Sequence, residues 1–136
     1  MIKKKAQAGV EYMIIIGFVT FAVMTILVIA TVYSGLIKDK IRANQIESFS
    51  IQLVNHAESV FFSGEPSLAT IRLYLPEGVE DITINTNDIV VTFSSSSGQN
   101  IRAFTSRVPL QGTIVANEGL RTIKIEAKSD HVLISG

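Results

Sequence analysis

An uncharged apolar run from Tyr12 to Ile37 constrains this chain more than any other feature of its sequence. Its 26 residues include no formally charged side chain. As an α-helix, the run would extend about 39 Å at 1.5 Å per residue, whereas the hydrocarbon core of a bilayer is about 30 Å thick. A helix that is apolar on all sides is stable only in lipid or inside a bundle of similar helices. The run therefore predicts a membrane-spanning or bundle-forming helix.

A short basic leader precedes the apolar run. Lys3 to Lys5 are followed by the sequence Ala6-Gln-Ala-Gly-Val-Glu-Tyr12. A secretory signal peptide has its cleavage site after its apolar segment, but here the chain continues as Lys38-Asp-Lys-Ile-Arg42 with no Ala-x-Ala site. The processing-like motif lies before the run, so cleavage there would remove the lysines and keep the helix. The lysines also favour a cytoplasmic N-terminus.

Helical periodicity continues beyond the run, but on one face only. The apolar residues of that face are Ile46, Phe49, Leu53, Ala57 and Val60. Ser63-Gly-Glu-Pro66 then supplies a glycine stop and a proline just beyond it. We therefore expect one long helix over residues 7–62 and a linker over residues 63–67. Gly35 is the most favourable position for a bend in that helix.

The pattern changes to a period of two after the linker. Apolar residues recur at every second position in 71–75, 82–84, 89–93 and 123–127, and further strands are expected near 101–108, 113–116 and 131–135. About seven short strands at this spacing predict an antiparallel β-sandwich head over residues 68–136. The expected fold class is α+β: one long N-terminal helix, with an apolar first half and an amphipathic second half, followed by this head. The amphipathic half would cover one face of the head.

The residues of the leader resemble those of a known family. Lys5-Ala-Gln-Ala-Gly-Val-Glu-Tyr12, followed at once by a long apolar helix, resembles the class III signal peptide of archaeal type IV-like pilins. The resemblance implies that a prepilin peptidase cuts between Ala6 and Gln7 and removes residues 1–6. Glu11 would then be the fifth residue of the mature chain, where type IV pilins generally keep a glutamate. The family typically carries a β-sandwich after the helix, and the head resembles it only in kind.

The resemblance also implies a function and a location. The chain would be a structural subunit of an archaeal cell-surface filament that serves surface adhesion, with its precursor in the cytoplasmic membrane. Its implied partners are further copies of itself, the prepilin peptidase and the pilus assembly machinery in the membrane. Two alternatives stay open: a single-pass membrane-anchored β-sandwich binding protein that does not polymerise, and a minor pilin.

The assembly residues are expected at the start of the mature helix, at Gln7, Glu11 and Tyr12. A carboxylate at the edge of an apolar run is costly unless it is paired. We therefore expect Glu11 to pair with the amino group freed at Gln7, in the same chain or a neighbour. The alternative is an interfacial acid that the helix dipole favours. The side chains expected to pack in the core of the helix bundle are Ile14, Ile15, Ile16, Phe18, Val19, Phe21, Val23, Ile26, Leu27 and Ile29.

Composition and motifs argue against other functions. The chain has no cysteine, which excludes disulfides and thiolate metal sites. It has no nucleophile elbow, phosphate-binding glycine loop or His-Glu-x-x-His motif, so we expect neither enzyme activity nor a cofactor. His56 and His131 are distant in sequence, and no metal site is expected. Without its three leading lysines the chain has 9 basic and 12 acidic residues, which argues against a nucleic-acid partner.

Three polar clusters in the expected head have structural interpretations. Ser94 to Ser97, before a glycine, predict a flexible hairpin turn, with O-glycosylation as the alternative. Asn85 to Asp88 predict a turn rather than a calcium site, because no spaced acidic loop follows. Glu77, Glu80 and Asp81 are expected to form a solvated rim.

Overall fold

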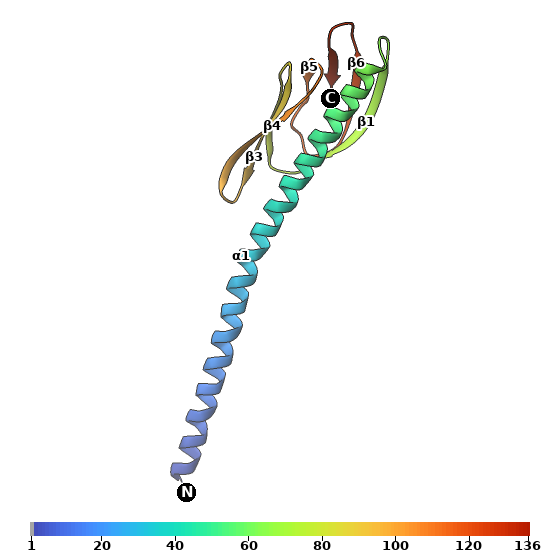
Figure 1. The fold of residues 1–136 in the computed structure, drawn as a ribbon. Coiled ribbons are helices and arrows are strands. Elements are labelled where there is room, and N and C mark those ends of the chain that lie inside the picture. The colour runs from blue at the N-terminus through green and yellow to red at the C-terminus, as the bar shows by residue number, and fades with distance from the viewer. Residues whose placement is uncertain (1) are drawn as a thin grey trace. The chain divides into compact units, whose positions relative to one another are not determined.

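The computed structural model describes the backbone of residues 2–136 and the side chains from Ala8 onward (Figure 1). One helix, α1 (Ile2–Phe62), precedes seven strands. The strands are β1 (Leu68–Leu75), β2 (Val79–Ile84), β3 (Asp88–Ser95), β4 (Gly98–Thr105), β5 (Leu110–Thr113), β6 (Gly119–Ala127) and β7 (Val132–Ser135). The α+β fold class, with one long helix followed by antiparallel-rich sheets, is confirmed.

The helix belongs to two compact units. One unit comprises Met1–Lys38, and the other comprises Asp39–Gly136. The second half of α1 therefore packs with the strands and is part of the head, whereas the sequence had suggested a division at the linker after Phe62. α1 runs through Gly35 without a break.

The end of α1 is set by a glycine, as the sequence predicts. Gly64 has a φ of 80°, a left-handed conformation that glycine adopts without the steric penalty of a side chain. The N–H of Gly64 donates to the carbonyl of Phe61 at 3.0 Å. The Ser63 hydroxyl donates to the carbonyl of Ser59 at 2.8 Å. These bonds satisfy carbonyls that the helix end would otherwise leave without partners.

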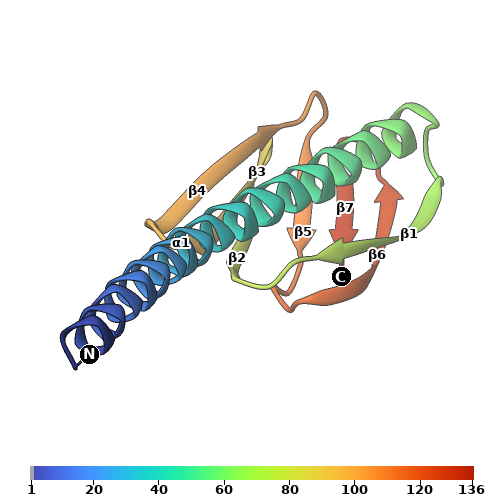
Figure 2. The same ribbon diagram turned by 90° about the horizontal axis from the view of Figure 1, so that it is seen from below.

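The strands form two sheets. Sheet A has the order β1-β6-β7-β5, and sheet B has the order β2-β3-β4. Every pairing is antiparallel except that of β5 with β7, which is parallel. Figure 2 shows the second half of α1 lying across the strands of both sheets.

One core joins the helix to both sheets. The five residues predicted on the apolar face of the helix, from Ile46 to Val60, are all buried. They share a cluster with Leu75 and Ile125 of sheet A and with Val91 of sheet B. Along β1, β3 and β6, alternate residues face this cluster and the others face away from it, as a half-buried sheet requires. The amphipathic half of α1 therefore covers the inner faces of the sheets, as expected.

The expected strand at residues 113–116 is wrong by three positions, because β5 is Leu110–Thr113. Pro109 and Gly112 are residue types that are typical of turns. Gly112 instead allows a close strand contact: a Cβ at this position would lie 1.8 Å from the carbonyl oxygen of Ile134 on β7. Its φ of 130° is also one that other residues rarely adopt. Only glycine fits where β5 meets β7.

Candidate assembly surface

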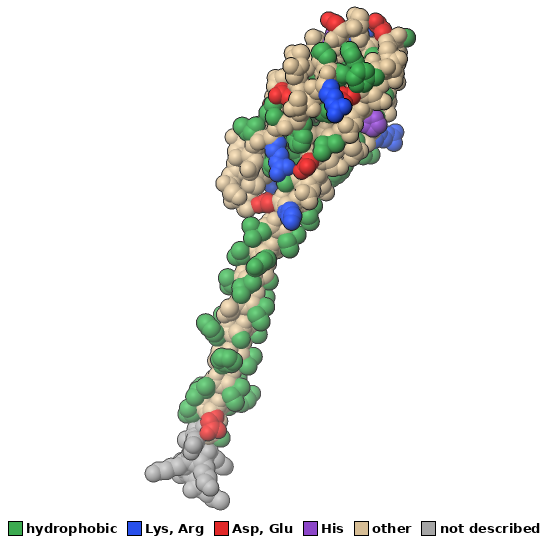
Figure 3. All heavy atoms as spheres, viewed as in Figure 1, with side chains coloured by type: hydrophobic (Ala, Val, Ile, Leu, Met, Phe, Trp, Pro, Cys, Tyr) green, Lys and Arg blue, Asp and Glu red, His purple; other side chains and the backbone are tan. Residues whose placement is uncertain are grey.

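The first half of α1 presents a continuous apolar surface that no side chain among residues 8–136 covers. Between Ala8 and Ile37, every large apolar side chain is 47–77% exposed. Figure 3 shows these side chains along this part of the helix. One 18-residue window has a mean hydropathy of 2.8, and none of it is buried. By length and composition this helix could anchor the chain in a membrane.

The ten side chains predicted for a bundle core lie on this surface and pack against nothing else in the described residues. Three of them, Ile14, Ile15 and Ile16, are consecutive, and successive residues of an α-helix point about 100° apart. The apolar surface therefore extends around the helix. Their role in the core of a bundle stays a prediction, since it concerns contacts between copies.

Glu11 is the one charged residue between Ala8 and Ile37. It is exposed and forms no ion pair or side-chain hydrogen bond with any of residues 8–136. It follows Gln7 by four positions in the sequence. The side chains of Ala6 and Gln7, the expected cleavage site, lie outside the described residues. Tyr12 is exposed beside Glu11, and the pairing of Glu11 stays a prediction.

A polar cluster at the start of the head was not predicted from the sequence. Arg42 Nη1 donates to the carbonyl of Ser94 at 3.1 Å, and Nη2 donates to Glu77 Oε1 at 3.2 Å. Asp39 Oδ1 lies 3.5 Å from Arg42 Nη1. Asp39 Oδ2 also accepts a bond from the N–H of Ser96 at 3.0 Å and another from the Ser96 hydroxyl. We call these five residues the hairpin latch, because they tie the β3–β4 hairpin and the β1–β2 turn to α1.

The hairpin latch adds a contact that the sequence does not reveal. Glu77, expected in a solvated rim, has a side chain that is 74% exposed, and it also forms an ion pair with Arg42. The only local signal was the Asp39–Arg42 spacing of three residues, which allows a contact on one helical face. The partners in the β3–β4 hairpin are more than 50 positions away, so no periodic pattern reveals them.

We expect the Arg42 guanidinium to contribute to the stability of the head. Its side chain is mostly buried, and its Nε has no hydrogen-bond partner in the structure. Hydrogen bonds to charged groups contribute about 1.5–3 kcal/mol. Because Arg42→Ala would also relieve the unpartnered Nε, we expect it to lower the free energy of unfolding by about 1–2 kcal/mol. Denaturant unfolding of the detergent-solubilised chain measures this change. The exposed neighbour Lys40 gives the matched control, and an equal loss for Lys40→Ala would contradict the assignment.

Asp39 makes the hairpin latch sensitive to acid. Hydrogen bonds from the Ser96 hydroxyl and N–H, with the nearby charge of Arg42, hold the pKa of the Asp39 carboxyl below its ordinary value of 3.8. Its contribution to stability is thus complete above that value and is lost as the pH falls through the lower pKa of the folded state. We expect the melting temperature of Asp39→Asn to depend less on pH than that of the wild type between pH 5 and about pH 2. Parallel pH profiles would contradict this assignment.

Two other polar clusters form the turns that the sequence predicts. The N–H of Asn85 donates to the carbonyl of Asp88 at 2.9 Å, and its side-chain amide donates to the Asp88 carboxylate at 2.6 Å. Ser96 and Ser97 connect β3 to β4. Ser95 and Gly98, on either side of them, form the last pair of the two strands. Neither turn gathers three metal-binding side chains, and no such group occurs among the described residues.

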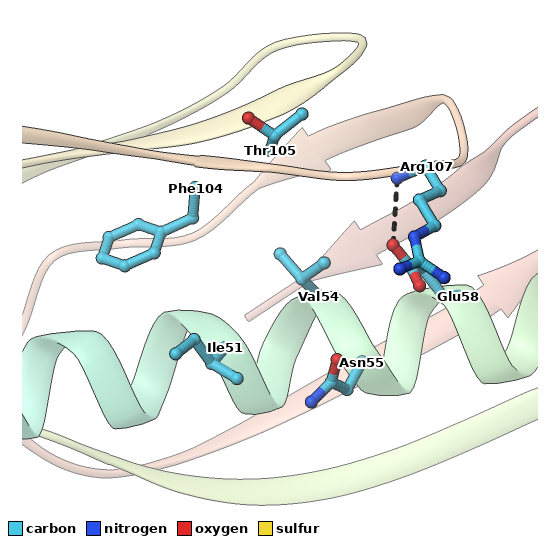
Figure 4. A pocket seen from close by; sticks show the side chains of 7 residues that line it. All are labelled: Ile51, Val54, Asn55, Glu58, Phe104, Thr105 and Arg107. Atoms are coloured by element: carbon cyan, nitrogen blue, oxygen red, sulfur yellow. Dashed lines mark hydrogen bonds between the residues drawn. The ribbon is translucent and has the colours of Figure 1, made fainter.

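An open groove lies between the second half of α1 and the end of β4 (Figure 4). Its volume is about 320 Å³. The lining residues are Ile51, Val54, Asn55, Glu58, Phe104, Thr105 and Arg107. Glu58 Oε1 already accepts the backbone N–H of Arg107 at 2.9 Å. No acid, base and nucleophile converge in the groove, so its geometry does not suggest a catalytic site.

No protein-family model, curated protein or solved structure matches the chain. The resemblance to archaeal pilins therefore rests on the residues of the leader and on the helix that follows them.

Proposed function

We propose that this chain is the structural subunit of an archaeal type IV-like cell-surface filament. A prepilin peptidase would cut it between Ala6 and Gln7, and the copies would then polymerise through the first half of α1. The observation that carries the proposal is the uncovered apolar surface from Ala8 to Ile37. Surface adhesion is the proposed purpose of the filament.

The apolar surface provides the energy for assembly. Burying ten large apolar side chains yields about 15–30 kcal/mol before the costs of association are subtracted. Only a fraction of this remains after ordering and lost rotation are included. When a subunit leaves the membrane, helices of other copies must replace the lipid, because water cannot. Identical subunits that meet through different faces form an open helical filament.

A membrane-anchored binding protein uses the same helix in a different way. Its helix would stay in lipid and its head would act alone. The processing-like motif before the apolar run favours the filament over this anchor. Filaments that consist mostly of this chain favour the major subunit, and filaments with little of it favour a minor pilin. Recovery of the chain only from the membrane fraction favours the anchor.

The mass of the N-terminal peptide, taken from protein at its native cell surface, tests the proposal most directly. We expect a peptide that begins at Gln7, with its glutamine open or cyclised. Such a start would require cleavage before the apolar helix, which a simple anchor does not need. A peptide that begins at Met1 or at one of the lysines would overturn the proposed processing and the filament with it.

Glu11→Gln tests the proposed pairing of the carboxylate with the amino group of Gln7. Cleavage is expected to remain normal because the variant keeps the residues on both sides of the cut. Filament yield is expected to fall about tenfold, which corresponds to about 1.4 kcal/mol per subunit. Quantitative blotting of sheared filaments measures the yield. Glu118→Gln is the control, since Glu118 is an exposed loop residue of the head. A normal yield for Glu11→Gln would show that the pairing is not needed.

A further inference from the structure

The outer face of sheet A carries positive charge that no side chain from Ala8 onward neutralises. Arg72 on β1 and Lys124 on β6 both point away from the core, in adjacent rows of the β1–β6 pairing. Neither forms an ion pair with a described residue. The one acid on this face, Glu126, is already paired with Lys128. The face is therefore basic.

Large apolar side chains surround these two cations. Tyr74 and Leu120 lie directly opposite each other on β1 and β6, 54% and 66% exposed. Leu68 is exposed at the other end of β1. Tyrosine and arginine together with exposed aliphatic side chains are typical of protein interfaces. This face has the composition of a contact surface and not that of a solvated one.

The outer face of sheet B carries the opposite charge. Glu80 and Asp81 on the edge strand β2 are exposed, and neither is in an ion pair with a described residue. Glu80 accepts a bond from Gln99, across β3, at 2.6 Å. The one cation of these strands, Arg102, points to the helix and pairs with Glu47 at 3.2 Å. The face is therefore acidic.

An apolar strip accompanies the acids of sheet B. Ile101 on β4 is 67% exposed, and its outward neighbour Ala103 is also exposed. Val90 lies opposite Ala103 on the central strand β3. Each sheet thus combines charge of one sign with exposed apolar side chains, and the two faces are complementary.

We propose that the outer face of sheet A in one copy of this chain docks against the outer face of sheet B in the next copy. The opposite charges make contact between unlike faces favourable and contact between like faces repulsive. An interface between two different faces leaves one free face on each copy, so it can be repeated without closing. The inference rests on the proposed function, because bundling of the helices is what brings the heads together at high effective concentration.

Charge reversal of the full-length chain tests this docking. One variant reverses the basic face (Arg72→Glu with Lys124→Glu), a second reverses the acidic face (Glu80→Lys with Asp81→Lys), and a third combines all four changes. We expect each single-face variant to reduce the assembled fraction about tenfold at low ionic strength, where exposed charges interact most strongly. The combined variant, in which the charges are exchanged, should recover to within about threefold of the wild type.

Folding and assembly are separated by two controls. Circular dichroism and protease resistance of each full-length variant in detergent show whether the head is folded. If a reversed variant does not fold, the milder pair Arg72→Gln with Lys124→Gln replaces it, with an expected loss of about threefold. A fourth variant, Glu118→Lys, changes the charge of the head outside both faces and should assemble normally.

The outcomes distinguish this inference from the function on which it rests. If the wild-type chain is never found in filaments, the proposed function itself is overturned. Filaments that form equally well from every single-face variant would overturn only the docking of the heads. The docking would also be overturned if the assembled fraction of the combined variant fell by the sum of the two single-face losses and did not recover. Such a result would indicate that each face meets a partner other than this chain.

Discussion

Phe21→Lys is expected to remove most of the chain from both the membrane and the filament. A lysine at the centre of a membrane helix costs about 2.5–3.5 kcal/mol on insertion scales, and the lost burial of phenylalanine adds about 1.5–3 kcal/mol. A combined cost of at least about 4 kcal/mol lowers the inserted or assembled fraction about a thousandfold. Alkaline extraction of membranes and blotting of sheared filaments measure the two fractions.

The matched control for this variant is Phe62→Lys. Phe21 and Phe62 are 70% and 72% exposed in the single chain, so the isolated structure gives no reason for different outcomes. They differ in what covers them after insertion or assembly, because Phe21 lies within the apolar run and Phe62 at the end of α1 in the head. Equal losses for both variants, or for neither, would contradict the proposed burial of the first half of the helix.

Phe49→Ala is expected to unfold the head more effectively than any surface change. Phe49 is 2% exposed, and it lies where the amphipathic half of α1 meets the sheets. Removing a buried phenylalanine costs about 3–5 kcal/mol in lost transfer energy and cavity formation. In a unit of this size, that loss should lower the melting temperature by at least about 12 °C.

Phe62→Ala serves as the control for the core variant. A large truncation at an exposed position should change the free energy of unfolding by less than about 0.5 kcal/mol. Denaturant unfolding of the full-length chain in a non-denaturing detergent compares the two. A small effect of Phe49→Ala would mean that the second half of α1 is not an integral part of the head.

The periodic parts of the fold were predictable from the sequence, and the special contacts were not. The helical spacing from Ile46 to Val60 identified the buried face of α1 because burial and periodicity have the same cause. β5 was misplaced because Pro109 and Gly112 are typical turn residues, whereas Gly112 is needed for the close approach of Ile134. The parallel pairing of β5 with β7 leaves no local pattern at all.

The candidate sites follow the same division. The uncharged run from Tyr12 to Ile37 directly indicates a surface for assembly or for a membrane, since only lipid or other helices can cover it. The hairpin latch and the opposite charges of the two sheets depend on which strands become neighbours. Alternation along a strand assigns Arg72 and Lys124 to a face, but it does not show that β1 lies beside β6. That neighbour relation came only from the three-dimensional structure.

The place of β7 in sheet A has a consequence for how the protein is made. β7 lies between β6 and β5, and Val132 and Ile134 are fully buried. Sheet A therefore cannot close until residues 132–135 have been synthesised. Pairings such as Leu68 with Glu126 join distant parts of the chain, and distant pairings form slowly. The apolar helix is thus complete early in synthesis, whereas sheet A can form only after its last strand, β7, has been made.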